Sequence, residues 1–139
     1  MFFVNRSKVI ARYAKGKVLD VGFGGGNPFL SNVTGIEITK TEKPVNYDKV
    51  LVMDAQNMTF ESRSFDSITV GCVLAHLENP SKFLRECHRV LKNNGRLIIT
   101  VPNPISPPTV LSNLFFPTHS SSASQHISVI PPQESCSLV

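Results

Sequence analysis

The chain has 139 residues, of which 41% are hydrophobic and 17% charged, and its formal net charge is +4. This length suits one domain with a core of its own and excludes two complete domains. No run of about 18 apolar residues is present, so no membrane-spanning helix is expected, nor is a secretory signal. The three cysteines form no CxxC pair, which disfavours a disulfide framework or zinc site and favours a cytoplasmic location.

The composition changes near residue 101. All 14 Lys and Arg residues lie before that point, whereas the segment after it contains seven of the ten prolines and nine serines. We therefore expect a folded core over residues 1–103. Residues 104–139 are expected to be a Pro- and Ser-rich tail that is partly irregular or disordered.

Hydrophobic periodicity predicts the elements in chain order. A short helix over residues 5–15 is expected to place Val9, Ile10 and Tyr13 on one face. Apolar runs then predict strands over residues 17–21, 33–38, 49–53, 65–70 and 96–101, with a clear amphipathic helix over 80–92 before the last of them. Strands that are apolar on both faces and alternate with helices indicate a doubly wound, mostly parallel α/β sheet.

Two of the connections between predicted strands are short for a parallel sheet. Residues 39–48 and 55–64 must connect parallel strands, and a parallel crossover normally needs about a dozen residues or more, usually with a helix. We expect one or both of these crossovers to be short or irregular. Near the end of the chain, residues 126–130 are at most a brief strand.

The first predicted strand leads into a glycine loop with the spacing G-x-G-x-G, and Asp20 lies two residues ahead of its first glycine. Glycines at the carboxyl end of a parallel strand let the backbone approach a ligand closely. A dinucleotide-binding loop would need a further glycine where this chain has Asn27, so an NAD-dependent oxidoreductase is disfavoured. A tight turn without a ligand remains the alternative.

Two more acids follow the next two strands. Glu37 lies near the end of the second strand, where a carboxylate can accept hydrogen bonds from both hydroxyls of a ribose. Asp54 ends the third strand and is followed by Ala55 and Gln56, so it can accept from an adenine amine. With no P-loop lysine motif in the sequence, this pattern favours a nucleoside ligand without a polyphosphate. The alternative is that the acids are solvated strand ends.

Taken together, these residues resemble class I S-adenosylmethionine-dependent methyltransferases, a broad group that includes small-molecule and cofactor-biosynthesis enzymes. The resemblance covers residues 15–103 and is carried by five blocks in order: 18–26 (VLDVGFGGG), 35–38 (GIEI), 54–60 (DAQNMTF), 64–68 (SFDSI) and 73–103. It implies a Rossmann-like methyltransferase sheet. That sheet normally continues past the fifth strand with two more strands, one antiparallel. No convincing pair of closing strands follows residue 103, so we expect an incomplete sheet. The chain is then expected to be truncated, with a variant or a minimal form completed by another subunit as the alternatives.

The resemblance also implies roles for particular residues. S-adenosyl-L-methionine is the implied cofactor, and its contacts would come from the following set: Asp20 at the amino end of the methionine, Gly22, Gly24 and Gly26 along methionine and ribose, Glu37 at the ribose hydroxyls, Asp54 with Ala55 and Gln56 around the adenine, and Cys72 near the sulfonium. His76 is the candidate catalytic base, although it can instead cap the following turn. No metal is expected, because no His, Cys and Asp cluster has metal-ligand spacing.

The leading functional hypothesis is methyl transfer to a small-molecule acceptor. The alternative is a non-catalytic cofactor-binding remnant that has lost its acceptor-binding half. A nucleic-acid partner ranks last, because the basic residues are scattered and no aromatic platform for stacking bases is evident. An exposed sheet edge would favour a homo-oligomer.

Overall fold

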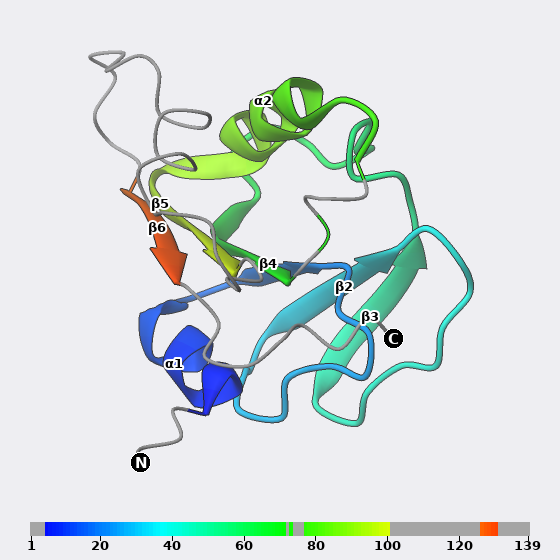
Figure 1. Ribbon diagram of the computed structural model, residues 1–139, viewed down its shortest axis with the longest axis vertical. Helices are drawn as coiled ribbons and strands as arrows, with labels where there is room; N and C mark the ends of the chain where they lie inside the picture. The colour runs from blue at the N-terminus through cyan, green and yellow to red at the C-terminus, as the bar shows by residue number, and fades with distance from the viewer. Residues whose placement is uncertain (1–4, 72, 74–76, 101–125, 131–139) are drawn as a thin grey trace, which may run out of the picture.

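The computed structural model describes residues 5–71, 73, 77–100 and 126–130 (Figure 1). Within these residues, six strands form one sheet in the order β3-β2-β1-β4-β5-β6, and every neighbouring pair is parallel. The elements are α1 (Arg6–Tyr13), β1 (Val18–Val21), β2 (Val33–Glu37), β3 (Tyr47–Val52), β4 (Phe65–Gly71), α2 (Pro80–Val90), β5 (Leu91–Thr100) and β6 (His126–Ile130). The predicted parallel α/β fold is confirmed.

The two described helices cover opposite faces of the sheet (Figure 1). Side chains of β1 alternate between these faces, as they do in any strand. Leu19 belongs to the larger apolar core, which includes Phe83 and Cys87 of α2. Val18 belongs to a smaller core, against which Ala14 at the end of α1 packs. No helix in the described part of the chain is long and apolar enough to cross a membrane.

Helix α1 begins where the sequence predicts, and its buried face includes Ile10 but not Tyr13. The Asn5 side chain caps it by accepting a hydrogen bond from the backbone N–H of Lys8 at 3.2 Å. Ile10 is buried, and Ala11 and Ala14 pack against the smaller core. The prediction that Tyr13 lies on the buried face is wrong, because the helix turns its small alanines toward the sheet and leaves Tyr13 exposed.

Helix α2 begins as predicted, with Asn79 as its N-cap and Pro80 in its first turn. It ends at Val90, two residues early, because buried Leu91 already pairs with Phe65 in the sheet. Strand β5 therefore starts at Leu91 and not at residue 96 as predicted. A register shift before Arg96 accommodates the exposed residues 92–94.

The other strands differ from prediction by one or two residues at their ends. Strand β1 starts at Val18 and β2 ends at Glu37, each one residue inside the predicted range, while β4 runs one residue further to Gly71. Strand β3 spans Tyr47–Val52 and not residues 49–53, because Tyr47 pairs with Val33 at the start of β2. The earlier start brings a buried tyrosine into the sheet.

The crossovers on either side of β2 contain no helix in the structure, and for the crossover after β2 this is expected from its length. In these crossovers, a side chain forms hydrogen bonds with backbone carbonyl groups. The Asn46 amide donates to the carbonyls of Asn27 at 2.8 Å and Leu30 at 2.9 Å. These bonds join the β1–β2 loop to the β2–β3 loop and satisfy carbonyls that a helix would otherwise pair internally.

The crossover from β3 to β4 is also irregular and is held by two charged residues of α2. The Arg89 guanidinium donates to the carbonyls of Phe60 at 2.7 Å and Met58 at 3.0 Å. Glu86 accepts from the Met58 N–H at 2.7 Å and pairs with Arg89 at 2.9 Å. The planar guanidinium suits this task because it presents several donors in a fixed geometry.

Gly35 in the middle of β2 leaves room for two aromatic rings. A Cβ at this position would lie 2.6 Å from the Phe23 ring and 3.1 Å from the Tyr47 ring. We expect Gly35→Ala to lower the free energy of unfolding by about 1–3 kcal/mol, because the rings must move out of a packed position. Denaturant unfolding measures this change.

The matched control is Gly25→Ala, because a Cβ on Gly25 meets no atom within 4 Å and Gly25 is not among the glycines with positive φ. Its stability should stay within about 0.5 kcal/mol of the parent. Equal losses in both variants would contradict the packing explanation.

The sheet extends one strand beyond β5. Residues 126–130 form β6, which confirms the predicted brief strand and pairs in parallel with β5 from Arg96↔His126 to Thr100↔Ile130. These five residues of the predicted tail therefore join the sheet. The rest of the segment after residue 100 lies outside the described residues, so the domain boundary at residue 103 stays a prediction.

Candidate functional site

The glycine loop leaves the carboxyl end of β1 in left-handed backbone conformations. The φ angles of Gly22, Gly24 and Gly26 are 65°, 56° and 88°. The Gly22 N–H donates to the carbonyl of Ile36 at 2.9 Å, and a Cβ on Gly22 would lie 1.9 Å from a methyl carbon of Val73. A side chain at position 22 is therefore excluded by both backbone conformation and space. By contrast, Gly24 faces open space, with no atom within 4 Å of a Cβ placed there.

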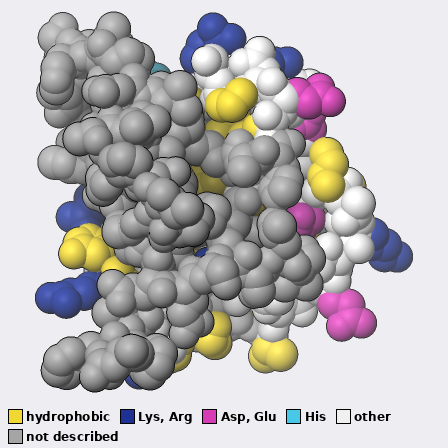
Figure 2. Space-filling model, viewed as in Figure 1, with side chains coloured by type: hydrophobic (Ala, Val, Ile, Leu, Met, Phe, Trp, Pro, Cys, Tyr) yellow, Lys and Arg dark blue, Asp and Glu magenta, His cyan; other side chains and the backbone are white. Residues whose placement is uncertain are grey.

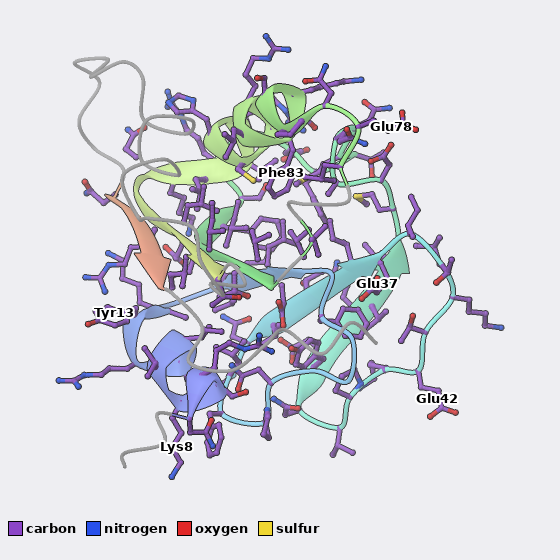
Figure 3. All side chains as sticks on the ribbon, viewed as in Figure 1. Lys8, Tyr13, Glu37, Glu42, Glu78 and Phe83 are labelled. Carbon is purple, nitrogen blue, oxygen red and sulfur yellow. The ribbon has the colours of Figure 1, made fainter. Side chains whose placement is uncertain are left out.

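Glu37 closes the glycine loop against β2. It is the last residue of β2 and half-buried (Figure 3). Its Oε1 accepts a hydrogen bond from the Gly24 N–H at 2.9 Å. An ionised carboxylate has about four acceptor sites. Glu37 can therefore hold the loop and still accept hydrogen bonds from a ligand.

The loop after β3 is tied to the start of α2. The Asp54 Oδ1 accepts from the backbone N–H of Gln56 at 2.8 Å and from its side-chain amide at 3.3 Å. The Gln56 Oε1 accepts in turn from the N–H of Asn79 at 2.6 Å. Ala55, between them, is buried. This chain of bonds orients the loop that carries the predicted adenine-binding residues.

These parts surround an open cavity of about 320 Å³ at the carboxyl ends of the strands. It is lined by Val21, Gly22, Ile36, Glu37, Ile38, Met53, Asp54, Ala55, Gln56, Val73, Leu77 and Glu78. The structure thus brings together five of the predicted site residues, which come from three strand ends. Among the described residues that line it there are three acids and no Lys or Arg, although the whole chain carries a net charge of +4.

The cavity also has a part that the sequence analysis missed. Ile38, Met53 and Leu77 are apolar side chains on its wall, and Glu78 adds a third acid. Ile38 is 67% exposed, and the only signal for it in the sequence is its position directly after Glu37, the predicted ribose-binding acid. In Figure 2 the visible Asp and Glu side chains lie on the right of the view, the side on which Figure 3 labels Glu37 and Glu78.

Asp20 is placed differently from the other predicted acids. It does not line the cavity, it is only 7% exposed, and it lies within β1, paired with Gly35. The Tyr47 hydroxyl donates to its Oδ2, and the Thr69 hydroxyl donates to its Oδ1 at 2.9 Å. Burial raises the pKa of Asp20 to about 6, against the lowering effect of both hydrogen bonds. A contact between Asp20 and the methionine stays a prediction.

Four predicted site residues remain, and the structure describes two of them, Gly24 and Gly26. Cys72 and His76 lie outside the described residues. Gly24 and Gly26 belong to the loop but do not line the cavity. No group of three His, Cys, Asp or Glu side chains within the described residues has a geometry that could hold a metal ion.

Residues 19–99 match the family described as "Methyltransferase domain". The match covers more than half of the chain and spans β1 to β5, apart from the first residue of β1 and the last residue of β5, together with all the described lining of the cavity. The chain belongs to this methyltransferase family. Its resemblance to class I enzymes is thereby confirmed, and S-adenosyl-L-methionine is the cofactor that goes with this fold.

Individual relatives agree with the family. The chain is 37% identical over 97 residues to a demethylmenaquinone methyltransferase from Thermotoga maritima, a match that covers 60% of this chain and 42% of that protein. It is 33% identical over 108 residues to a ubiquinone biosynthesis O-methyltransferase from Dechloromonas aromatica, covering 63% and 44%. The chain therefore spans less than half the length of these two relatives.

Solved structures share the fold. The crystal structure of the YcgJ protein from Bacillus subtilis superposes with a TM-score of 0.57 at 24% sequence identity, covering 88% of this chain and 62% of that one. At this level of identity the likeness establishes the Rossmann-like sheet. The functional assignment must come from the site itself.

Proposed function

We propose that this methyltransferase transfers a methyl group from S-adenosylmethionine to a small-molecule acceptor. The observation that carries the proposal is the cavity at the strand ends, where Glu37, Asp54 and the glycine loop come together. S-adenosylmethionine, when bound, supplies a methyl group on a positively charged sulfonium sulfur, which is already an activated donor. The chain's contribution is then to bind, orient and exclude water.

The described residues fit such a cofactor. A cavity of about 320 Å³ lies within the usual range for small-molecule sites of roughly 300–1,000 Å³. Its three acids favour a ligand that carries positive charge, and Gly24 leaves the loop open to close approach. The predicted absence of a metal stays a prediction.

Each side of the cavity has a chemically distinct task. Glu37 would accept hydrogen bonds from the ribose hydroxyls. Asp54 would accept from the adenine amine, while the apolar wall of Ile38, Met53 and Leu77 would contact the flat faces of the base. Holding two reactants in line can contribute roughly 7–11 kcal/mol to lowering a barrier. His76 stays the proposed base that would take a proton from the acceptor.

The family assignment does not identify the methyl acceptor, so the identity of the acceptor is part of the proposal. Two relatives are named for demethylmenaquinone and for ubiquinone biosynthesis, so aromatic precursors of quinones are the first acceptors to test. Self-association through the edge strands β3 or β6 and a cytoplasmic location stay predictions.

The decisive experiment has two stages. Calorimetry of the full chain with S-adenosylmethionine should give a dissociation constant in the micromolar range, and no heat at millimolar ligand would overturn the proposal. Transfer of a labelled methyl group to a panel of phenolic and quinol acceptors then tests catalysis. Binding without transfer to any acceptor would select the non-catalytic remnant instead.

A further inference from the structure

Tyr47 lies at the centre of a buried polar cluster behind the cofactor cavity. It is the first residue of β3 and is 2% exposed. Its hydroxyl donates a hydrogen bond to the Asp20 carboxyl and accepts one from the backbone N–H of Asn27 at 2.8 Å. One side chain thereby connects β3, β1 and the end of the glycine loop.

The position of the Tyr47 ring follows from local packing. The ring extends from β3 across β2 at Gly35, which has no side chain to block it. It packs against Phe23 of the glycine loop with ring centroids 5.4 Å apart. Both the ring and the hydroxyl of Tyr47 therefore contact the loop that borders the cofactor cavity.

The end of the loop depends on side chains for its shape, because no helix follows it in the described structure. The Asn27 side chain donates to the Ser7 carbonyl at 2.9 Å, and the Asn27 carbonyl accepts from the Asn46 amide at 2.8 Å. The Asn27 N–H is held by the Tyr47 hydroxyl. Of these three partners of Asn27, only Tyr47 is itself hydrogen-bonded to a buried carboxyl, that of Asp20.

We propose that Tyr47 is a positioning residue for cofactor binding, which transmits the state of the Asp20 carboxyl to the glycine loop through its hydroxyl. The inference rests on the proposed function for its effect on S-adenosylmethionine. The contact itself is independent of that function. An ionised carboxylate is a stronger acceptor than a protonated one, so the link is tightest when Asp20 is ionised.

The groups that face Asp20 determine how this link responds to pH. They are the hydroxyls of Tyr47 and Thr69 and, at longer range, the carboxylate of Glu37. Burial keeps the pKa of Tyr47 well above its ordinary value, so its hydroxyl stays a donor. Cofactor affinity in the parent should therefore fall as the pH drops through about 6, the pKa of Asp20.

Three variants of the full chain test the proposal by calorimetry with S-adenosylmethionine between pH 5 and 8.5. Tyr47→Phe should weaken binding at pH 8 by about tenfold and flatten the change near pH 6, because the link to Asp20 is cut. Thr69→Val removes the other donor to Asp20 and should move the inflection to higher pH without abolishing it. Tyr13→Phe, which alters the only other tyrosine, should match the parent.

The outcomes separate the two proposals. A parent that binds no S-adenosylmethionine at any pH contradicts the proposed function. A parent that binds, together with a Tyr47→Phe variant that keeps the same inflection or the same affinity, overturns the role of Tyr47 and leaves the function intact.

A measurement on the unaltered protein covers the case in which Tyr47→Phe does not fold. The amide resonance of Asn27 should be protected from hydrogen exchange and should shift with an inflection near pH 6. An Asn27 amide that exchanges freely or does not respond to pH would also overturn the inference.

Discussion

Replacing Glu37 with Gln should raise the dissociation constant for S-adenosylmethionine by about 10- to 100-fold. The change removes the negative charge that would accept the ribose hydroxyls and leaves one amide oxygen for both the Gly24 N–H and the ligand. Hydrogen bonds to charged groups are worth about 1.5–3 kcal/mol each, which sets this range. Calorimetry at pH 8, where Asp20 is ionised, measures the effect.

Glu42→Gln is the matched control for this substitution. Glu42 is an exposed acid of the β2–β3 loop (Figure 3) and does not line the cavity. The same loss of charge there should change the affinity by less than about twofold, since exposed charges are well screened. If the two variants bind equally well, Glu37 does not contact the ligand and the assignment of the ribose site fails.

Asp20→Asn should change how stability depends on pH. The pKa of Asp20 is about 6 in the folded protein against 3.8 for an ordinary Asp, so the folded state binds the extra proton between these values. The free energy of unfolding of the parent therefore falls by about 3 kcal/mol on this account as the pH rises from below 4 to above 6. The variant lacks this loss, because an amide does not ionise and can donate to the Thr69 hydroxyl.

Denaturant unfolding of both proteins at pH 4 and pH 7 tests this sign. The stability of Asp20→Asn relative to the parent should improve by about 2.4 kcal/mol from pH 4 to pH 7, because at pH 4 the unfolded Asp is already partly ionised. Asp48→Asn, which neutralises an exposed acid of β3, should follow the parent. A constant difference between Asp20→Asn and the parent would show that Asp20 binds protons equally in the folded and unfolded protein, and would contradict the raised pKa.

Much of the site could be predicted from the sequence because it depends on chain order. In a parallel sheet, the residues that follow successive strands meet at one edge. That rule, together with the acids at positions 37 and 54, was sufficient to predict that Glu37, Asp54 and Gly22 line one cavity. The irregular crossovers were equally predictable, because ten residues leave little room for a helix between parallel strands.

Other features depend on distances between side chains that are far apart in the sequence. Asp20 and Tyr47 are separated by 27 positions, and no local pattern shows that a tyrosine ring crosses β2 at Gly35 to reach a carboxyl in β1. The predicted third strand begins at residue 49, which places Tyr47 in a loop. The buried pairing of Tyr47 with Val33 corrects this and reveals the cluster.

By itself, the sequence determined the parallel α/β fold, the methyltransferase family and the strand ends that form the cavity, because hydrophobic period and motif spacing are local properties. Only the tertiary structure decided that Glu78 joins the cavity lining and that Asp20 is buried behind it. The reason is physical: a carboxyl at a strand end is solvated, whereas one a single residue earlier is enclosed by the neighbouring strands and depends on Tyr47 and Thr69 for its hydrogen bonds.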